Sequence, residues 1–158
     1  MKTLVLGLGN SILSDDGVGL YVAQEIKQKI SRPDVSVAWT ESGGINLLER
    51  LIGYDKVIIV DAVLTGKAAP GTITRFDVNK ANACRHANST HGIDFASVVE
   101  LGKMLQLAIT EQIMLFGIEV RDVSSFQEKC TIEVERAIPV CAGLVIQELD
   151  SITDTVLP

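Results

Sequence analysis

Residues 4–19 read LVLGLGNSILSDDGVG, which indicates a short apolar strand, a glycine-containing turn and the start of a helix. Ligand sites in open α/β sheets form at such strand-to-helix crossings. Most of these crossings bind phosphate through bare backbone N–H groups. Here the adjacent carboxylates of Asp15 and Asp16 precede the helix, and their charge favours a cation over phosphate. The glycines Gly7 and Gly9 by themselves predict no more than a tight turn.

Strand and helix patterns alternate along the whole chain. We expect strands at 3–8, 35–40, 56–63, 72–78 and 112–118, and helices at 17–30, 45–51, 92–107 and 128–150. This alternation predicts one α/β domain over residues 1–150, a three-layer sandwich with helices on both faces of a twisted, mostly parallel (mixed) five-stranded sheet. Either 35–40 or 72–78 is expected to run antiparallel at an edge. Pro139 is expected to kink the last helix or split off its first part, and residues 151–158 to form a flexible tail.

Composition excludes several classes of protein. The chain has 158 residues, 47% of them hydrophobic, and a net charge of −6. It is the size of one domain and too apolar for disorder. The absence of a basic stripe argues against a nucleic-acid partner, and the apolar runs are too short to span a membrane. Three scattered cysteines and no signal-peptide pattern predict a cytoplasmic protein with reduced thiols.

Three carboxylates are candidate site residues. Asp15 and Asp16 have an ordinary explanation as helix caps, but one aspartate is sufficient for capping, so capping and metal ligation both remain open. Asp61 ends the most apolar strand pattern, 57–60. If that strand is parallel to the first, Asp61 and the aspartate pair lie at the same edge of the sheet, where α/β sites form. This coincidence favours a functional Asp61 over one that only stabilises a turn.

The chain has two histidines, His86 and His91. His91 directly precedes a predicted helix, whereas His86 lies in a polar stretch beside Cys84 and is the weaker candidate. A lone histidine at a helix start is more often a surface residue than a metal ligand. Candidate carboxylates on the same edge of the sheet make a ligand role for His91 more favourable. Two carboxylates and one imidazole suit a divalent ion such as Ni²⁺, Zn²⁺ or Mn²⁺. They leave coordination positions open for water or a substrate group.

These motifs resemble those of the hydrogenase maturation endopeptidases, the proteases that trim the large subunit of NiFe hydrogenases. The opening stretch is followed, in the family's order and spacing, by ESGG at 41–44, VIIVDA at 57–62, STH at 89–91 and FGIE at 116–119. The family's metal-contacting residues correspond to Asp16, Asp61 and His91. Many members have glutamate in place of Asp16 and glutamine in place of Glu119.

The resemblance implies a metal-dependent endopeptidase that removes a short C-terminal extension from the hydrogenase large-subunit precursor after nickel insertion. Asp16, Asp61 and His91 are then both the catalytic and the metal-contacting residues, and the precursor supplies the nickel. We expect zinc, cadmium or manganese to occupy the same site in vitro. Whether the ion activates the water or carbonyl, or a carboxylate acts as general base, is left open.

Two other functions are compatible with the residues. A metal-sensing maturation chaperone would bind the precursor without cutting it, so the precursor's mass would not change. A small nucleotide-binding α/β protein is suggested by the glycine pair Gly7 and Gly9, but Asp15 and Asp16 at the anion position disfavour it.

Overall fold

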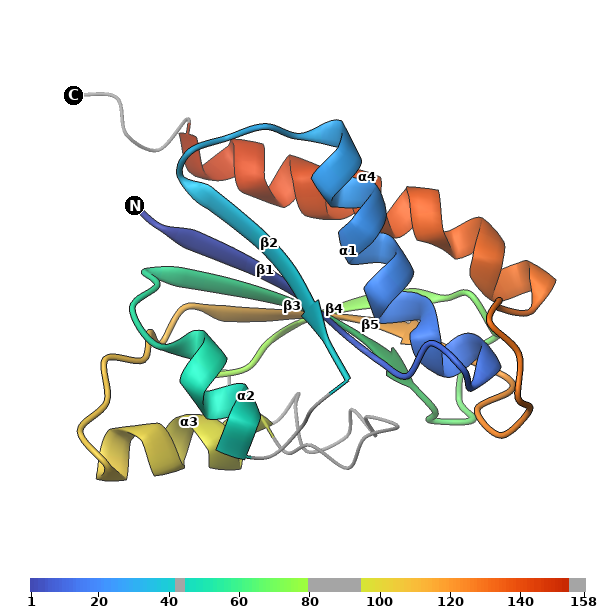
Figure 1. Cartoon of the computed structure of the whole chain (residues 1–158), viewed down its shortest axis with the longest axis horizontal. Helices are drawn as coiled ribbons and strands as arrows, with labels where there is room; N and C mark the ends of the chain where they lie inside the picture. Colours follow the sequence, from blue (N-terminus) through green and yellow to red (C-terminus); the bar gives the residue numbers. More distant parts are fainter. Residues whose placement is uncertain (42–44, 80–94, 154–158) are drawn as a thin grey trace.

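The computed structural model describes residues 1–41, 45–79 and 95–153 (Figure 1). Its elements in chain order are β1 (Thr3–Leu8), the 3-10 helix η1 (Ser14–Gly17), α1 (Val18–Lys29), β2 (Val35–Thr40), α2 (Ile45–Leu51), β3 (Lys56–Val63), β4 (Ile73–Asp77), α3 (Phe95–Met104), β5 (Ile113–Glu119) and α4 (Ile132–Thr153). Every predicted strand is confirmed to within one residue. None of the helices in the described ranges is long and apolar enough to cross a membrane.

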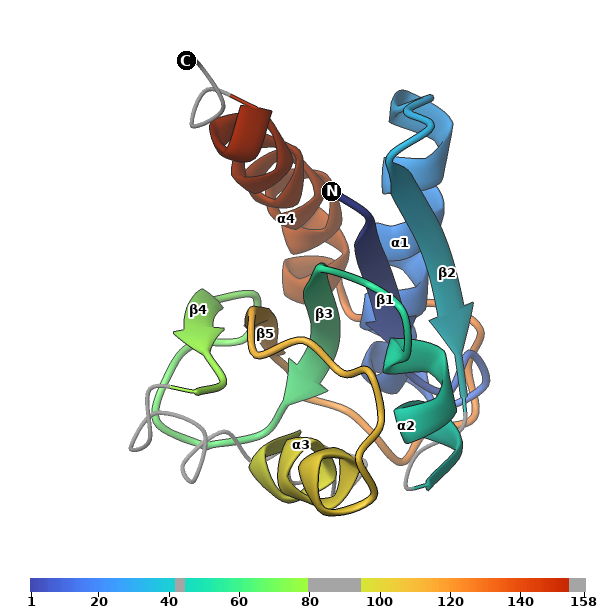
Figure 2. The ribbon, with the colours of Figure 1, turned by 90° about the vertical axis from the view of Figure 1, so that its left-hand side faces the viewer.

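The strands form one sheet in the order β2-β1-β3-β5-β4. Strands β1, β2, β3 and β5 are parallel, and β4 runs antiparallel at one edge. Helices α1 and α4 cover one face, and α2 and α3 cover the other (Figure 2). The predicted three-layer α/β sandwich with a mixed sheet is therefore confirmed, and 73–77 is its antiparallel edge strand.

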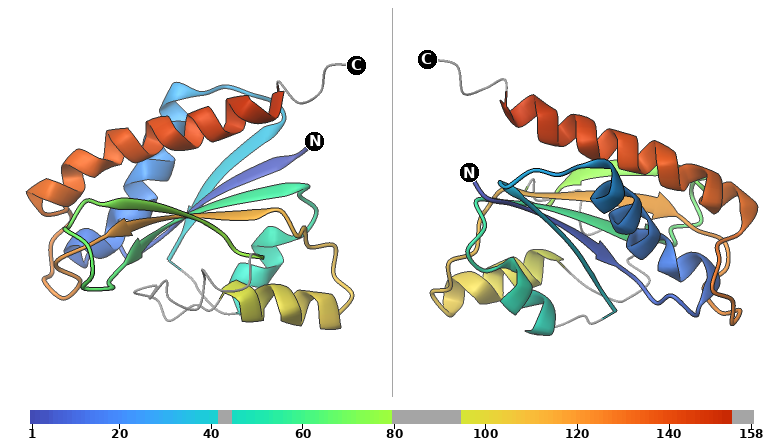
Figure 3. Two further views of the ribbon diagram at one scale, coloured as in Figure 1. Left: turned by 180° about the vertical axis from the view of Figure 1, so that it is seen from behind. Right: turned by 45° about the horizontal axis from the view of Figure 1, so that its top comes forward.

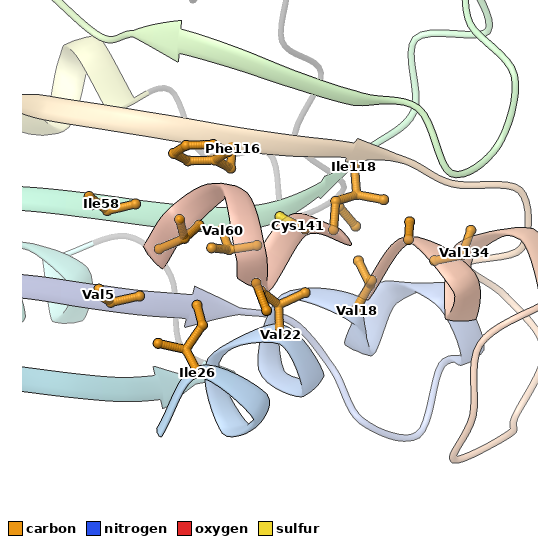
Figure 4. Packing of buried hydrophobic residues seen from close by; sticks show 14 of the residues in the cluster. Val5, Val18, Val22, Ile26, Ile58, Val60, Phe116, Ile118, Val134 and Cys141 are labelled. Carbon is orange, nitrogen blue, oxygen red and sulfur yellow. The ribbon is translucent and has the colours of Figure 1, made fainter. Parts of the chain in front are cut away.

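Strand β3 is buried along its whole length, as a central strand between two helical layers should be. Ile58 and Val60 pack in the core beneath α1 and α4 (Figure 4). Val57 and Ile59 pack in the opposite core, against α2 and α3. Because side chains alternate between the two faces of a strand, Asp61 is directed to the α2/α3 side.

Helix α4 is continuous for 22 residues through Pro139 (Figure 3), so of the two expected effects of Pro139 the separation of the helix's first part is wrong. Proline removes one backbone hydrogen bond from a helix interior. Burial of the α4 face against the sheet and α1 offsets that loss, because tertiary packing supplies most helix stability in proteins. The buried side chains on this face are Val134, Ala137, Cys141, Ala142, Val145 and Leu149. The helix also includes residues 151–153, which the sequence pattern had assigned to the tail.

Two glycines allow α1 to approach the sheet closely. A Cβ atom on Gly19 would overlap the carbonyl oxygen of Leu8 and lie 2.5 Å from that of Val60, and one on Gly7 would overlap the carbonyl oxygen of Gly19. Neither glycine is among those described with positive φ. The role of Gly7 and Gly19 is thus helix–strand packing, as for the third glycine of dinucleotide-binding folds. For Gly7, the interpretation as a turn residue alone is wrong.

Replacing Gly19 with alanine should lower the free energy of unfolding by about 1–3 kcal/mol, because the new methyl group meets rigid backbone on two strands. Gly143→Ala is the matched control, since nothing lies within 4 Å of its Cβ position in α4. We expect that variant to be up to about 1 kcal/mol more stable than the parent. Urea unfolding followed by circular dichroism measures both, and equal stabilities would contradict the packing role.

Cys130 and Cys141 are buried in the core beneath α1 and α4. Burial raises the pKa of both thiols from 9.0 to about 12, and the negative charges of Asp15 and Glu135 contribute to the Cys130 shift. Thiolates are the reactive form of cysteine. Both residues should therefore be structural and inert.

We predict that Cys130 and Cys141 resist iodoacetamide at pH 8 in the folded protein and react in denaturant, as read by peptide mass spectrometry.

The two raised pKa values also make the stability of the protein depend on pH. The unfolded chain ionises these thiols above about pH 9, whereas the folded protein keeps them protonated to about pH 12. Their contribution to stability is therefore complete below pH 9 and declines between pH 9 and 12. Rapid labelling of both thiols in the folded state would contradict the raised pKa values and the inert, structural role of the two cysteines.

Candidate functional site

The carboxyl ends of the parallel strands meet at one edge of the sheet, where the chain turns from β1 into η1 and from β5 into α4 (Figure 3). Open α/β sheets form their sites at this edge. Two of the three predicted ligands lie here in the described structure, Asp16 in η1 and Asp61 in β3.

Asp61 is fully buried and lies opposite Gly117 of β5. Asp61 directly follows the apolar run 57–60, and β3 continues to its predicted end at Val63, which pairs with Glu119 of β5. Asp61 is therefore held by strand pairing on both sides of its own position. Such a residue is placed more rigidly than one in a loop.

Asp16 is 5% exposed, and its 3-10 helix lies against β3. Its backbone N–H donates to the carbonyl oxygen of Leu13 at 3.1 Å, and its own carbonyl accepts from the N–H of Asn10 at 3.2 Å. These bonds close the turn between β1 and α1 around Asp16. The structure thus brings Asp16 and Asp61 to the same edge, on two elements in contact.

His91 lies outside the described residues, as do His86 and Cys84. Helix α3, which begins shortly after His91 at Phe95, packs on the same face of the sheet as Ile59. Within the residues that the structure describes, no three His, Cys, Asp or Glu side chains come together as a metal-binding group.

Asp15 has a role that the sequence reasoning missed. It is fully buried and accepts hydrogen bonds from the backbone N–H groups of Arg121 and Asp122, both at 3.0 Å. Its other carboxylate oxygen accepts from the backbone N–H of Thr131 at 2.6 Å, and the Thr131 hydroxyl lies 2.9 Å from both oxygens. Asp15 therefore neither caps the adjacent helix nor stands free as a ligand; it ties the β5–α4 connection to the turn after β1.

The same two segments are joined by a short parallel bridge between Leu13 and Gln127. The N–H of Gln127 donates to the carbonyl of Ile12 at 3.0 Å, and the N–H of Ser14 donates to the carbonyl of Gln127 at 2.8 Å. Ser14 adopts a positive φ of 49°, unusual for a residue with a side chain. The residue in the left-handed conformation is thus a serine, and its hydrogen bond to Gln127 of the β5–α4 connection holds it there.

Tyr21 of α1 adds a further link. Its hydroxyl donates to the carbonyl oxygen of Glu128 at 2.7 Å and lies 3.3 Å from that of Ser11. Burial raises the pKa of Tyr21, and the negative charge of Glu128 adds to the shift. The hydroxyl therefore stays protonated and keeps its donor at neutral pH.

Two more carboxylates anchor loops at this edge. Glu41, after β2, accepts from the hydroxyl and the backbone N–H of Ser11, at 2.9 and 3.3 Å. Glu119 is 3% exposed and accepts at 2.9 Å from the backbone N–H groups of Thr65 and Gly66, and also from the Thr65 hydroxyl. A glutamine could make the same contacts as Glu119, since its carbonyl would face the two N–H groups and its amide the hydroxyl.

No local signal in the sequence marks Asp15, Glu41 or Glu119 as anchors. The partners of Asp15 and Glu119 lie more than fifty residues away along the chain. The structure thus separates the acidic residues of this edge into loop anchors and the two predicted site residues, Asp16 and Asp61.

Comparison with known proteins agrees with this fold. A family model of hydrogenase maturation proteases matches residues 20–148, a range that begins after Asp16 and includes Asp61 and His91. The hydrogenase 2 maturation protease of Escherichia coli is 36% identical over 74 residues, which are 46% of this chain and 45% of that protein. A putative hydrogenase maturation protease of Methanocaldococcus jannaschii is 33% identical over 97 residues, 59% of this chain and 62% of that protein. These alignments therefore span only about half of either relative.

Solved structures match over a longer range. The hydrogenase maturating endopeptidase HybD of Escherichia coli superposes with a TM-score of 0.75 at 25% identity, covering 96% of this chain and 93% of that one. The maturation protease HycI of Thermococcus kodakarensis shares the fold, with a TM-score of 0.74 at 24% identity over 94% of this chain and 92% of that one. The family model covers well over half of the sequence and the strand order and helical layers agree, so this chain belongs to the hydrogenase maturation protease family.

Proposed function

We propose that this protein is an endopeptidase that removes a short C-terminal extension from the large-subunit precursor of a NiFe hydrogenase once nickel has been inserted. The observation that supports the proposal is the placement of Asp16 and Asp61. Both carboxylates are buried at the carboxyl edge of the sheet, on contacting elements, in a chain of the hydrogenase maturation protease family.

In this proposal Asp16, Asp61 and His91 contact the nickel that the precursor brings with it. Two carboxylates and one imidazole are suitable ligands for such an ion. Three protein ligands also leave positions open, which the precursor's own nickel ligands would fill. Such a site binds strongly only when the loaded substrate is present, so cleavage follows metal insertion.

The cleavage step needs a polarised peptide carbonyl and an activated water. A divalent ion beside the scissile bond supplies either effect, and Asp16 or Asp61 can accept the proton that the water loses. The other carboxylates contribute by rigidity. Asp15, Glu41 and Glu119 hold the surrounding loops, and a site is effective when such supporting contacts fix its geometry.

Nickel loading provides the direct test of this function. Purified protein should shorten a nickel-loaded large-subunit precursor and leave the nickel-free precursor intact, as read by the mass of the subunit. Binding of the loaded precursor without any change in mass would replace the proposal with a chaperone function. Equal cleavage of loaded and nickel-free precursor would contradict the role of nickel.

Single substitutions test the assigned residues. Asp16→Asn, Asp61→Asn and His91→Ala should each reduce cleavage of the loaded precursor by about a hundredfold or more, because each removes a ligand or the proton acceptor. Asp15→Asn is the matched control at the neighbouring position. It should instead lower the free energy of unfolding by about 2–3 kcal/mol, since an amide places donors against the N–H groups that Asp15 accepts.

Thermal melts and cleavage rates, measured on all four variants, separate these effects. At temperatures where it is folded, the Asp15 variant should keep more activity than the Asp16, Asp61 and His91 variants, because Asp15 affects cleavage only through the loops that it anchors. Normal cleavage rates for the Asp16, Asp61 and His91 variants would remove these residues from the site.

A further inference from the structure

Two large apolar side chains are exposed beside the candidate site. Phe126 is 82% exposed and Ile12 is 47% exposed. The parallel bridge between Leu13 and Gln127 places their preceding neighbours, Ile12 and Phe126, opposite one another. Because bridged backbone segments lie about 4.8 Å apart, the two side chains extend from adjacent segments of backbone. We call these two residues the apolar pair.

The backbone that bears the apolar pair is rigid. The turn and the β5–α4 connection are joined by Asp15, by Tyr21 and by the bridge itself. On the N-terminal side of Phe126, the carboxylate of Asp122 accepts hydrogen bonds from the backbone N–H groups of Ser124 and Ser125, at 3.0 and 2.9 Å. An exposed apolar side chain on a preorganised loop loses little conformational entropy when it binds a partner.

The position of the apolar pair points to its partner. Ile12 belongs to the same turn as Asp16, so the pair is continuous with the candidate site. The exposed charges next to Phe126 are of both signs, Arg121, Glu128 and Lys129, and the protein's net charge is −6. An anionic membrane surface attracts clusters of basic residues, which this loop does not provide. Exposed aromatic side chains with a polar surround are instead typical of protein–protein contacts.

We propose that Ile12 and Phe126 form a docking site for the polypeptide substrate, where they seat against an apolar patch of the hydrogenase large-subunit precursor next to the scissile bond. This inference rests on the proposed function and adds a residue-level account of substrate binding. The pair contacts residues of the precursor that flank the scissile bond and not the reacting atoms themselves, so its contribution is to substrate binding.

The test is steady-state cleavage of the nickel-loaded precursor by Phe126→Ser and Ile12→Ser. We expect KM to rise by about tenfold or more, as for loss of an interface hot spot, with kcat and melting temperature unchanged. Phe126→Leu should recover most of the affinity, because it keeps a large apolar side chain. Met104→Ser is the matched control: Met104 is 75% exposed and is the last residue of α3, a helix that lies away from the β5–α4 connection (Figure 1).

The outcomes are distinguishable from failure of the proposed function. If the unaltered protein does not cut the precursor, the proposed function fails, and calorimetric binding of the loaded precursor to the same variants still tests the docking site. Unchanged KM and binding affinity in the Phe126 and Ile12 variants would overturn the docking site while leaving the protease assignment intact. An equal effect of Met104→Ser, or a dimer that Phe126→Ser dissociates without a change in KM, would also overturn it.

Discussion

The buried carboxylate of Asp15 is the interaction on which the site depends. It accepts hydrogen bonds from three backbone N–H groups and one hydroxyl, all on the connection between β5 and α4. Hydrogen bonds to an ionised group are shorter and stronger than neutral ones. The bonds join the turn after β1 to the start of α4. The position of Asp16 follows directly, because its backbone belongs to the same closed turn.

The acidic residues at this edge therefore divide into two groups with different physical roles. Asp15 and Glu119 accept hydrogen bonds from loop donors on both carboxylate oxygens, Glu41 accepts on one, and all three act as structural anchors. Asp16 and Asp61 lie between these anchored loops, on a 3-10 helix and on the central strand. The close approach of Gly19 to the carbonyl oxygens of Leu8 in β1 and Val60 in β3 lets the start of α1, which directly follows the 3-10 helix, lie against the sheet, since a side chain at Gly19 would push α1 away.

Much of the fold was predictable because burial leaves a clear pattern. The apolar run 57–60 indicated a central strand covered on both faces, and the structure confirms it. The prediction that Pro139 divides the last helix was wrong, because local helix propensity does not include the burial of the face that stabilises α4. The strand pattern also predicted the end of β3 at Val63, but it did not indicate that Asp61 pairs with Gly117 of β5. That pairing partner is distant in the sequence.

The sequence by itself determined the α/β class, the order of strands and helices, and a short set of candidate residues, because periodicity and residue chemistry are local properties. Only the tertiary structure decided that Asp15 is an anchor and that Gly7 and Gly19 serve helix–strand contact. It also showed that Ile12 and Phe126 are exposed on two segments that the bridge between Leu13 and Gln127 joins. Each of these roles depends on a partner far away along the chain. Adjacent aspartates with the same chemistry thus acquire different roles from the backbone that surrounds them.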